Sequence, residues 1–100
     1  MNIDKKLENG KLTLALQGRL DTTTAPQLEQ ELLENDTDGV TMLCLDFAQL
    51  DYISSAGLRV LLASQKRMNQ RQGSMVLCHV NDTIKEVFDI TGFSDLLTIE

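Results

Sequence analysis

The strongest constraint on the fold is a continuous apolar run at residues 40–47, Val-Thr-Met-Leu-Cys-Leu-Asp-Phe. A short run of this kind between polar segments is typical of a strand buried on both faces, and such strands usually lie in sheets covered by helices. No apolar run in the chain reaches the ~18 residues that a membrane-spanning helix needs. The run therefore predicts the centre of a sheet and argues against a membrane segment.

Two further strands are expected before this run. An Asn-Gly pair at positions 9–10 is a strong hairpin signal and joins residues 3–7 to residues 12–16. In the second segment three leucines alternate with Thr and Ala, which is the period-two pattern of a half-buried strand. We expect Gly18 to end that strand.

A helix is expected next. Thr24 can act as its N-cap, and Pro26 suits the first turn because its missing N–H would be unpaired there anyway. The polar residues 35–39 should end the helix. Leucines follow the cap at helical spacing: Leu28, Leu32 and Leu33.

The second half of the chain repeats the alternation. A helix should begin after Ser55 and end near Gly73, followed by an apolar strand over residues 75–80. Asn81 or Asp82 should cap a short third helix that Gly92 stops, and residues 95–99 form a last helical turn or an edge strand. One face of the second helix is apolar or long-chained: Leu58, Leu61, Leu62, Gln65 and Met68.

The order β-β-α-β-α-β-α predicts an α/β fold, a mixed sheet of about four to five strands packed against helices. With 100 residues, one domain spanning residues 1–100 is the default expectation.

The net charge and the cysteines of the chain argue against several classes of function. The formal net charge is −6, which disfavours binding to nucleic acid or to anionic lipid. The N-terminus lacks the apolar stretch of a secretory signal. Cys44 and Cys78 lie inside apolar runs, and we interpret both as reduced core residues of a cytoplasmic protein. Two cysteines and one histidine provide too few partners for a metal site.

The sequence also contains few residues that could form the catalytic site of an enzyme. The single histidine, His79, could pair with Ser55, but the surrounding residues do not form the G-x-S-x-G elbow of serine hydrolases. Asp46 and Asp51 could form a carboxylate pair or a Mg²⁺ site, although solvated loop acids are the simpler interpretation. No phosphate-binding G-x-x-x-x-G-K-[ST] motif occurs, so the sequence predicts no catalytic site and no cofactor.

The informative stretch is the loop expected between the buried run and the second helix, which ends in Ser54 and Ser55. In the simplest interpretation one serine is an N-cap and Gly57 is small for packing. The same position also suits a switch, because a phosphate there would lie beside the unpaired N–H groups and the positive end of the helix. It would add about −1.5 to −2 charge, which a docked partner would not tolerate.

Three segments of the chain form a recognisable set: residues 18–25 (GRLDTTTA), residues 52–62 (YISSAGLRVLL) and residues 87–93 (VFDITGF). In this order and spacing they resemble the STAS domain of bacterial anti-sigma factor antagonists. The first matches the family segment G-x-L-D-x-x-T-A, the second matches the segment around the family's phosphorylated serine, and the third matches a segment near the end of the domain. The family often has Asp directly before the phosphorylated serine, where this chain has Ser54.

The resemblance implies a partner switch. In the family, the unphosphorylated antagonist binds an anti-sigma factor that is itself a serine kinase, and this binding frees the sigma factor. The kinase inactivates the antagonist by phosphorylating one serine, and a serine phosphatase reverses the step. The matching residue is Ser55, with Ser54 as a second, less favoured acceptor.

Loops at one edge of a sheet should form one docking surface, and the expected contact residues follow the second and the central strands. They are Asp21, Thr22, Thr23, Thr24, Asp51, Tyr52, Ser54, Ser55, Ala56, Gly57 and Arg59. Two other classes stay open: a constitutive STAS subunit of a lipid-transport ATPase complex, in which Ser55 is only a cap or a contact, and an enzyme, for which the sequence offers no second catalytic group beside Ser55.

Overall fold

The computed structural model describes residues 1–35 and 39–100. Four strands form one mixed sheet in the order β1-β2-β3-β4. β1 and β2 are antiparallel, whereas β2, β3 and β4 are parallel. The strands are β1 (Asn2–Glu8), β2 (Lys11–Leu20), β3 (Met42–Ile53) and β4 (Ser74–Cys78). The helical elements are α1 (Ala25–Glu34), α2 (Ser55–Gln70), α3 (Asp82–Thr91) and the 3₁₀ turn η1 (Phe93–Asp95). The expected order of elements and the mixed sheet are confirmed.

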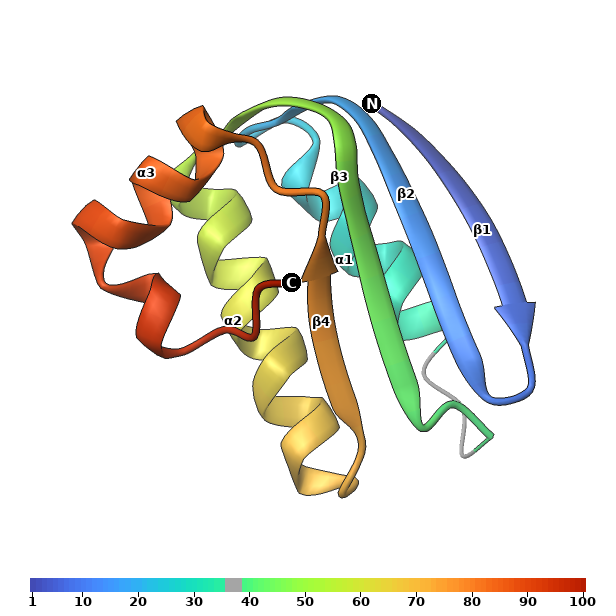
Figure 1. Cartoon of the computed structure of the whole chain (residues 1–100). Helices are drawn as coiled ribbons and strands as arrows, with labels where there is room; N and C mark the ends of the chain where they lie inside the picture. The colour runs from blue at the N-terminus through green and yellow to red at the C-terminus, as the bar shows by residue number, and fades with distance from the viewer. Residues whose placement is uncertain (36–38) are drawn as a thin grey trace.

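The core lies between the sheet and the helices. The register places the buried side chains of three strands in rows, with Leu12 opposite Leu43 and Leu43 opposite Met75. α1 and α2 lie on the same face of the sheet, and α3 lies beyond them, past β4 (Figure 1). Phe88 of α3 reaches the same core, since its ring centroid is 6.4 Å from that of Phe47.

The expectation that helices cover both faces of the central strand is wrong. Cys44 and Val76 are buried, but they are not part of the core cluster that packs against the helices. They lie side by side on the opposite face of the sheet, with Thr13 as the next neighbour in the row. Their burial comes from adjacent strands, which shield small side chains without a second helical layer.

Several element boundaries differ from the sequence-based expectation. Gly18 does not end β2 but lies inside it, with a φ of +110°. Leu33 is 53% exposed and does not belong to the buried face of α1. The helix ends at Glu34, and the middle of the predicted polar stretch, residues 36–38, lies outside the described residues.

The C-terminal residues combine the two expected alternatives. η1 forms one helical turn, and Ile99 then makes a parallel bridge with Leu77 at the free edge of β4. At the start and the end of α3 the expectations hold: the Asn81 side chain accepts the Ile84 N–H at 2.9 Å, and Gly92 ends the helix with a φ of +81°. The C-terminus therefore returns to the sheet beside β4 (Figure 1).

Candidate functional site

The candidate site lies where β2 and β3 end side by side. Their parallel pairing places Leu20 opposite Ile53, and the Ser54 N–H donates to the Leu20 carbonyl at 2.8 Å. α1 begins at Ala25, after the turn that follows β2, and α2 begins at Ser55, after β3. The structure therefore brings Asp21 and Ser55 to the same edge of the sheet, as the sequence predicts.

The connection before α2 is not the loop that the sequence suggests. β3 continues through Ile53, so only Ser54 separates the strand from the helix. Asp51 is an extra residue in this last part of the strand, because Leu50 lies opposite Gly18 and Tyr52 lies opposite Arg19. Such a bulge turns the strand locally and exposes side chains beside a site. Asp51 and Tyr52 are both exposed.

The two serines have different positions and different contacts. Ser54 is the N-cap of α2, and its Oγ accepts the Gly57 N–H at 3.4 Å. Ser55 is the first helical residue and is exposed. Its hydroxyl makes no hydrogen bond within the described part of the chain. The cap and the free hydroxyl thus belong to neighbouring residues, and a change at Ser55 leaves the cap intact.

Gly57 fixes how closely the start of α2 approaches the sheet. A Cβ atom at this position would lie 2.7 Å from Cγ of Leu20 and 3.0 Å from Cγ1 of Ile53. Both distances are shorter than normal van der Waals contact, so any side chain would push the helix away. Gly57 is itself buried, which makes it a packing residue.

The junction before α1 is held by Asp21. Its Oδ1 accepts the N–H groups of Thr23 and Thr24 at 3.0 and 3.1 Å. Thr24 occupies the N-cap position, but its side chain does not cap the helix as expected. Its Oγ1 instead accepts the Asp21 N–H at 2.9 Å and donates to the Arg19 carbonyl at 2.7 Å. Asp21 takes the anchoring role because its carboxylate reaches two successive N–H groups.

The same hydrogen bonds set the charge of Asp21. The N–H of Thr24 lowers the pKa of this carboxyl from its usual 3.8, and Thr23 and the Arg19 guanidinium act in the same direction. Partial desolvation opposes them without reversing the shift. Asp21 is therefore ionised at neutral pH and keeps a fixed negative charge at this edge of the sheet.

Arg19 is a neighbour that the sequence reasoning did not single out. Its guanidinium carbon lies 4.1 Å from the centre of the Tyr52 ring, and its Nε is 3.8 Å from Oδ2 of Asp21. A cation stacked on an aromatic ring holds both side chains in a defined position. The Arg19–Tyr52 pair becomes visible only from the β2–β3 register, because the two residues are distant in the sequence.

A shallow groove of about 430 Å³ runs from this edge between α1 and α2. Its lining on α2 repeats at helical spacing, with Ala56, Val60 and Ala63 on one stripe. Arg59 from α2 and Glu29 from α1 contribute opposite charges. The spacing of the α2 residues was available in the sequence, but which helix faces them was not.

The residues considered for catalysis do not assemble beside Ser55. His79 instead contacts Asp46, with Nδ1 2.9 Å from Oδ1. Asp46 is a strand residue and not a loop acid; partial burial raises its pKa, but hydrogen bonds from the Ala48 N–H and His79 outweigh this effect and lower it. Across residues 1–35 and 39–100, no three His, Cys, Asp or Glu side chains are arranged to hold a metal ion.

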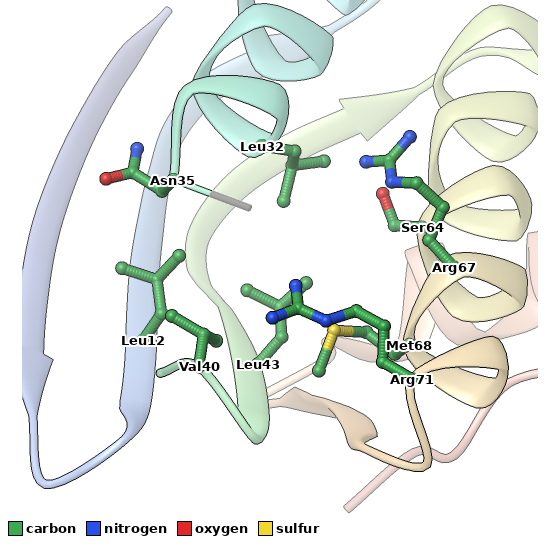
Figure 2. A pocket seen from close by; sticks show the side chains of 9 residues that line it. All are labelled: Leu12, Leu32, Asn35, Val40, Leu43, Ser64, Arg67, Met68 and Arg71. Atoms are coloured by element: carbon green, nitrogen blue, oxygen red, sulfur yellow. The ribbon is translucent and has the colours of Figure 1, made fainter. Parts of the chain in front are cut away.

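A second cavity lies between α1, α2 and the strands, away from this edge. Figure 2 shows Leu32 of α1 facing Leu12 and Leu43, and the cavity is also lined by Arg67 of α2 and by Arg71, which follows that helix. Its volume is about 20 Å³, which is room for about one water molecule. It is too small for an ordinary small-molecule ligand.

The model of the STAS domain family matches residues 2–100. The chain belongs to the STAS domain family of anti-sigma factor antagonists. A Bordetella bronchiseptica protein, BtrV, named as an anti-sigma factor antagonist, is 43% identical over 91% of this STAS chain and 78% of its own. The anti-sigma-B factor antagonist of Listeria monocytogenes is 30% identical over 100% of this chain and 90% of its own. The family resemblance drawn from the three motifs is confirmed.

Solved structures confirm the fold of this STAS domain. An anti-sigma factor antagonist of Thermotoga maritima matches with a TM-score of 0.89 at 17% identity, over 97% of this chain and 84% of its own. The phosphorylated form of SpoIIAA from Bacillus matches with a TM-score of 0.78 at 18% identity, over 99% of this chain and 91% of its own. Within the described residues, no helix has the length and apolar character needed to cross a membrane.

Proposed function

We propose that this STAS domain is a cytoplasmic anti-sigma factor antagonist controlled at Ser55. In its unphosphorylated form it binds an anti-sigma factor that is also a serine kinase, and this binding frees a sigma factor. Phosphorylation of Ser55 ends the binding, and a serine phosphatase restores it. The observation that carries the proposal is the exposed Ser55 hydroxyl at the first position of α2.

The scaffold tolerates a phosphate at this position. The first N–H groups of a helix and its positive end stabilise a nearby anion. Ser54 holds the cap with its own hydroxyl, so the modification of Ser55 does not remove it. The fold supports this point as well, since it matches the unphosphorylated and phosphorylated forms of SpoIIAA with TM-scores of 0.79 and 0.78.

The partner does not tolerate the phosphate, because it adds negative charge beside the carboxylates of Asp21 and Asp51. Asp21 is ionised across the same sheet edge, and the exposed Asp51 lies four residues before Ser55. A dianion inside a contact that excludes water would also lose its solvation. A penalty of roughly 3 kcal/mol lowers the affinity about a hundredfold.

The proposed docking surface combines the two strand ends with the groove between α1 and α2. Most of the residues expected from the sequence are exposed or half-buried there: Asp21, Thr22, Thr23, Thr24, Asp51, Tyr52, Ser54, Ser55, Ala56 and Arg59. Gly57 acts indirectly, by setting the position of α2. Ser54 is the poorer phosphate acceptor because its oxygen is occupied by the cap.

The proposal assigns no catalytic step to this chain. Its relatives are named as antagonists of anti-sigma factors, and members of the family are generally regulators without enzymatic activity. Those names also favour an antagonist over a constitutive subunit of a transport ATPase complex.

The test is phosphorylation and binding with the candidate anti-sigma kinase. After incubation with the kinase and ATP, mass spectrometry should place the phosphate on Ser55. The Ser55→Asp variant should bind the kinase about a hundredfold more weakly, whereas Ser55→Ala should bind normally and resist inactivation.

A matched control tests whether the loss of binding depends on where the negative charge is added. Ser74 is also exposed, but it lies opposite Met42 at the far end of β3. Ser74→Asp adds the same charge there and should leave the affinity unchanged. A phosphate on another residue, or equal binding by Ser55→Asp and the wild type, would contradict the proposal. Unfolding of Ser55→Asp would show that Ser55 is needed for the helix start instead.

A further inference from the structure

The two cysteines meet on the sheet face that carries no helix. They are 34 residues apart in the sequence, yet their Sγ atoms are 2.7 Å apart. The register explains the contact: Cys44 lies opposite Val76 on β4, and Cys78 follows two residues later opposite Asp46. The expectation that both cysteines are core residues holds for the burial of Cys44, but Cys78 is only partly buried.

Their surroundings differ from those of structural core cysteines. Neither belongs to the hydrophobic core cluster, and Cys78 is partly exposed. Cys44 is 5% exposed, so an external reagent reaches the pair through Cys78. In such a pair the accessible thiol can form a mixed disulfide with an oxidant. The shielded thiol can then attack that mixed disulfide and form a disulfide within the chain.

We propose that Cys44 and Cys78 are a reversible dithiol–disulfide pair, oxidised by a small-molecule or protein disulfide. The Cys78 thiolate attacks one sulfur of the oxidant and expels the other as a thiol, which leaves a mixed disulfide on Cys78. The Cys44 thiolate then attacks Sγ of Cys78 and expels the second thiol. The pair loses two protons and two electrons, and one oxidant disulfide becomes two thiols.

Burial and the neighbouring charges slow the oxidation of the pair at neutral pH. Burial raises the pKa of Cys78 to about 12, together with the hydrogen bond and charge of Cys44 and the nearby carboxylates of Glu100 and Asp46. Since the thiolate is the attacking species, closure should be slow at neutral pH and faster in alkaline buffer. His79 contacts one of these carboxylates, with its Nδ1 2.9 Å from Oδ1 of Asp46.

The bond would connect β3 to β4 and enclose α2 in a covalent loop. Closing a loop of this length restricts the unfolded chain and stabilises the fold. The pair lies in the first half of β3, whereas Ser55 follows the end of that strand. The two sites are therefore separate, and failure of either proposal leaves the other standing.

The test uses the reduced, folded chain and oxidised glutathione at about pH 8.5. We expect a monomer that has lost two hydrogen atoms, with peptide mapping that links Cys44 to Cys78. The oxidised form should melt about 10 °C above the reduced form, and dithiothreitol should reverse the shift.

Single cysteine variants distinguish the formation of the mixed disulfide from the closure of the Cys44–Cys78 bond. Cys44→Ala should retain a stable glutathione adduct on Cys78, and Cys78→Ser should not react while folded. The proposal is overturned if the wild type keeps the adduct, forms only intermolecular dimers, or stays reduced under conditions that oxidise the urea-unfolded chain. A lower melting temperature of the oxidised form would also overturn it, because the bond would then form at the expense of the fold.

Discussion

The starts of α1 and α2 differ in how their polar groups are used. Before α1, Asp21 and Thr24 bond to each other and to the backbone around them. Before α2, Ser54 makes the single side-chain cap, and the next hydroxyl, Ser55, is left exposed. Both junctions follow adjacent parallel strands, so the difference does not come from topology. A group that makes no local bond is available for modification, and this comparison separates the structural junction from the one that we propose to be regulated.

The largest expected effect tests how tightly the α2 junction is packed. Gly57→Ala should lower the free energy of unfolding by about 2 kcal/mol, because overpacking against Leu20 and Ile53 outweighs the better helix propensity of alanine. Urea unfolding measures the change. Gly39→Ala is the matched control, since a Cβ there meets nothing within 4 Å, and it should be nearly neutral. Equal stability of the two variants would show that α2 is free to shift away from the sheet.

The next effect tests whether Ser54 alone caps α2 while Ser55 has no structural role. Ser54→Ala should cost about 1 kcal/mol of unfolding free energy through loss of the cap, whereas Ser55→Ala should stay within about 0.5 kcal/mol of the wild type. Chemical denaturation of both variants in parallel provides the measurement. If Ser55→Ala is the more damaging change, the exposed hydroxyl has a structural role and the comparison fails.

A smaller effect is expected at the α1 junction. Asp21→Ala removes the acceptor of the Thr23 and Thr24 N–H groups and should lower the melting temperature by about 3 °C. Asp21→Asn keeps an acceptor oxygen and should recover most of the loss. Scanning calorimetry distinguishes them, and equal melting temperatures of Asp21→Ala and the wild type would show that Thr24 alone holds this junction.

The smallest effect is a difference in acid sensitivity. The pKa of Asp21 is lowered in the folded state, so its contribution to stability is present above the usual value of 3.8 and is lost as the pH falls through the lower folded value. Asp21→Asn should therefore flatten the loss of stability below about pH 4, measured as urea midpoints against pH. Ser54→Ala should run parallel to the wild type, because no titrating group is removed. An unchanged slope in Asp21→Asn would assign the acid sensitivity to other carboxyls, Asp46 among them.

Much of this protein could be read from local patterns. The hairpin at Asn9-Gly10, the alternating leucines of β2 and the stop at Gly92 depend on neighbours in the sequence, and the structure confirms them. The three motifs likewise identified the family, and the expected positions of Asp21 and Ser55 after two strands predicted that they share one edge of the sheet. These features are local because turn conformation, strand alternation and helix ends are set by a few adjacent residues.

Other features required the tertiary structure. Residues 48–53 mix polar and apolar side chains without a clear period, and pairing with β2 makes them strand. Register alone stacks Arg19 on Tyr52 and brings Cys44 against Cys78. Local sequence determines which segments become strands and helices and where most of them turn. The contacts between distant segments follow from how those strands align, since a shift of one residue would move every side chain to the other face of the sheet.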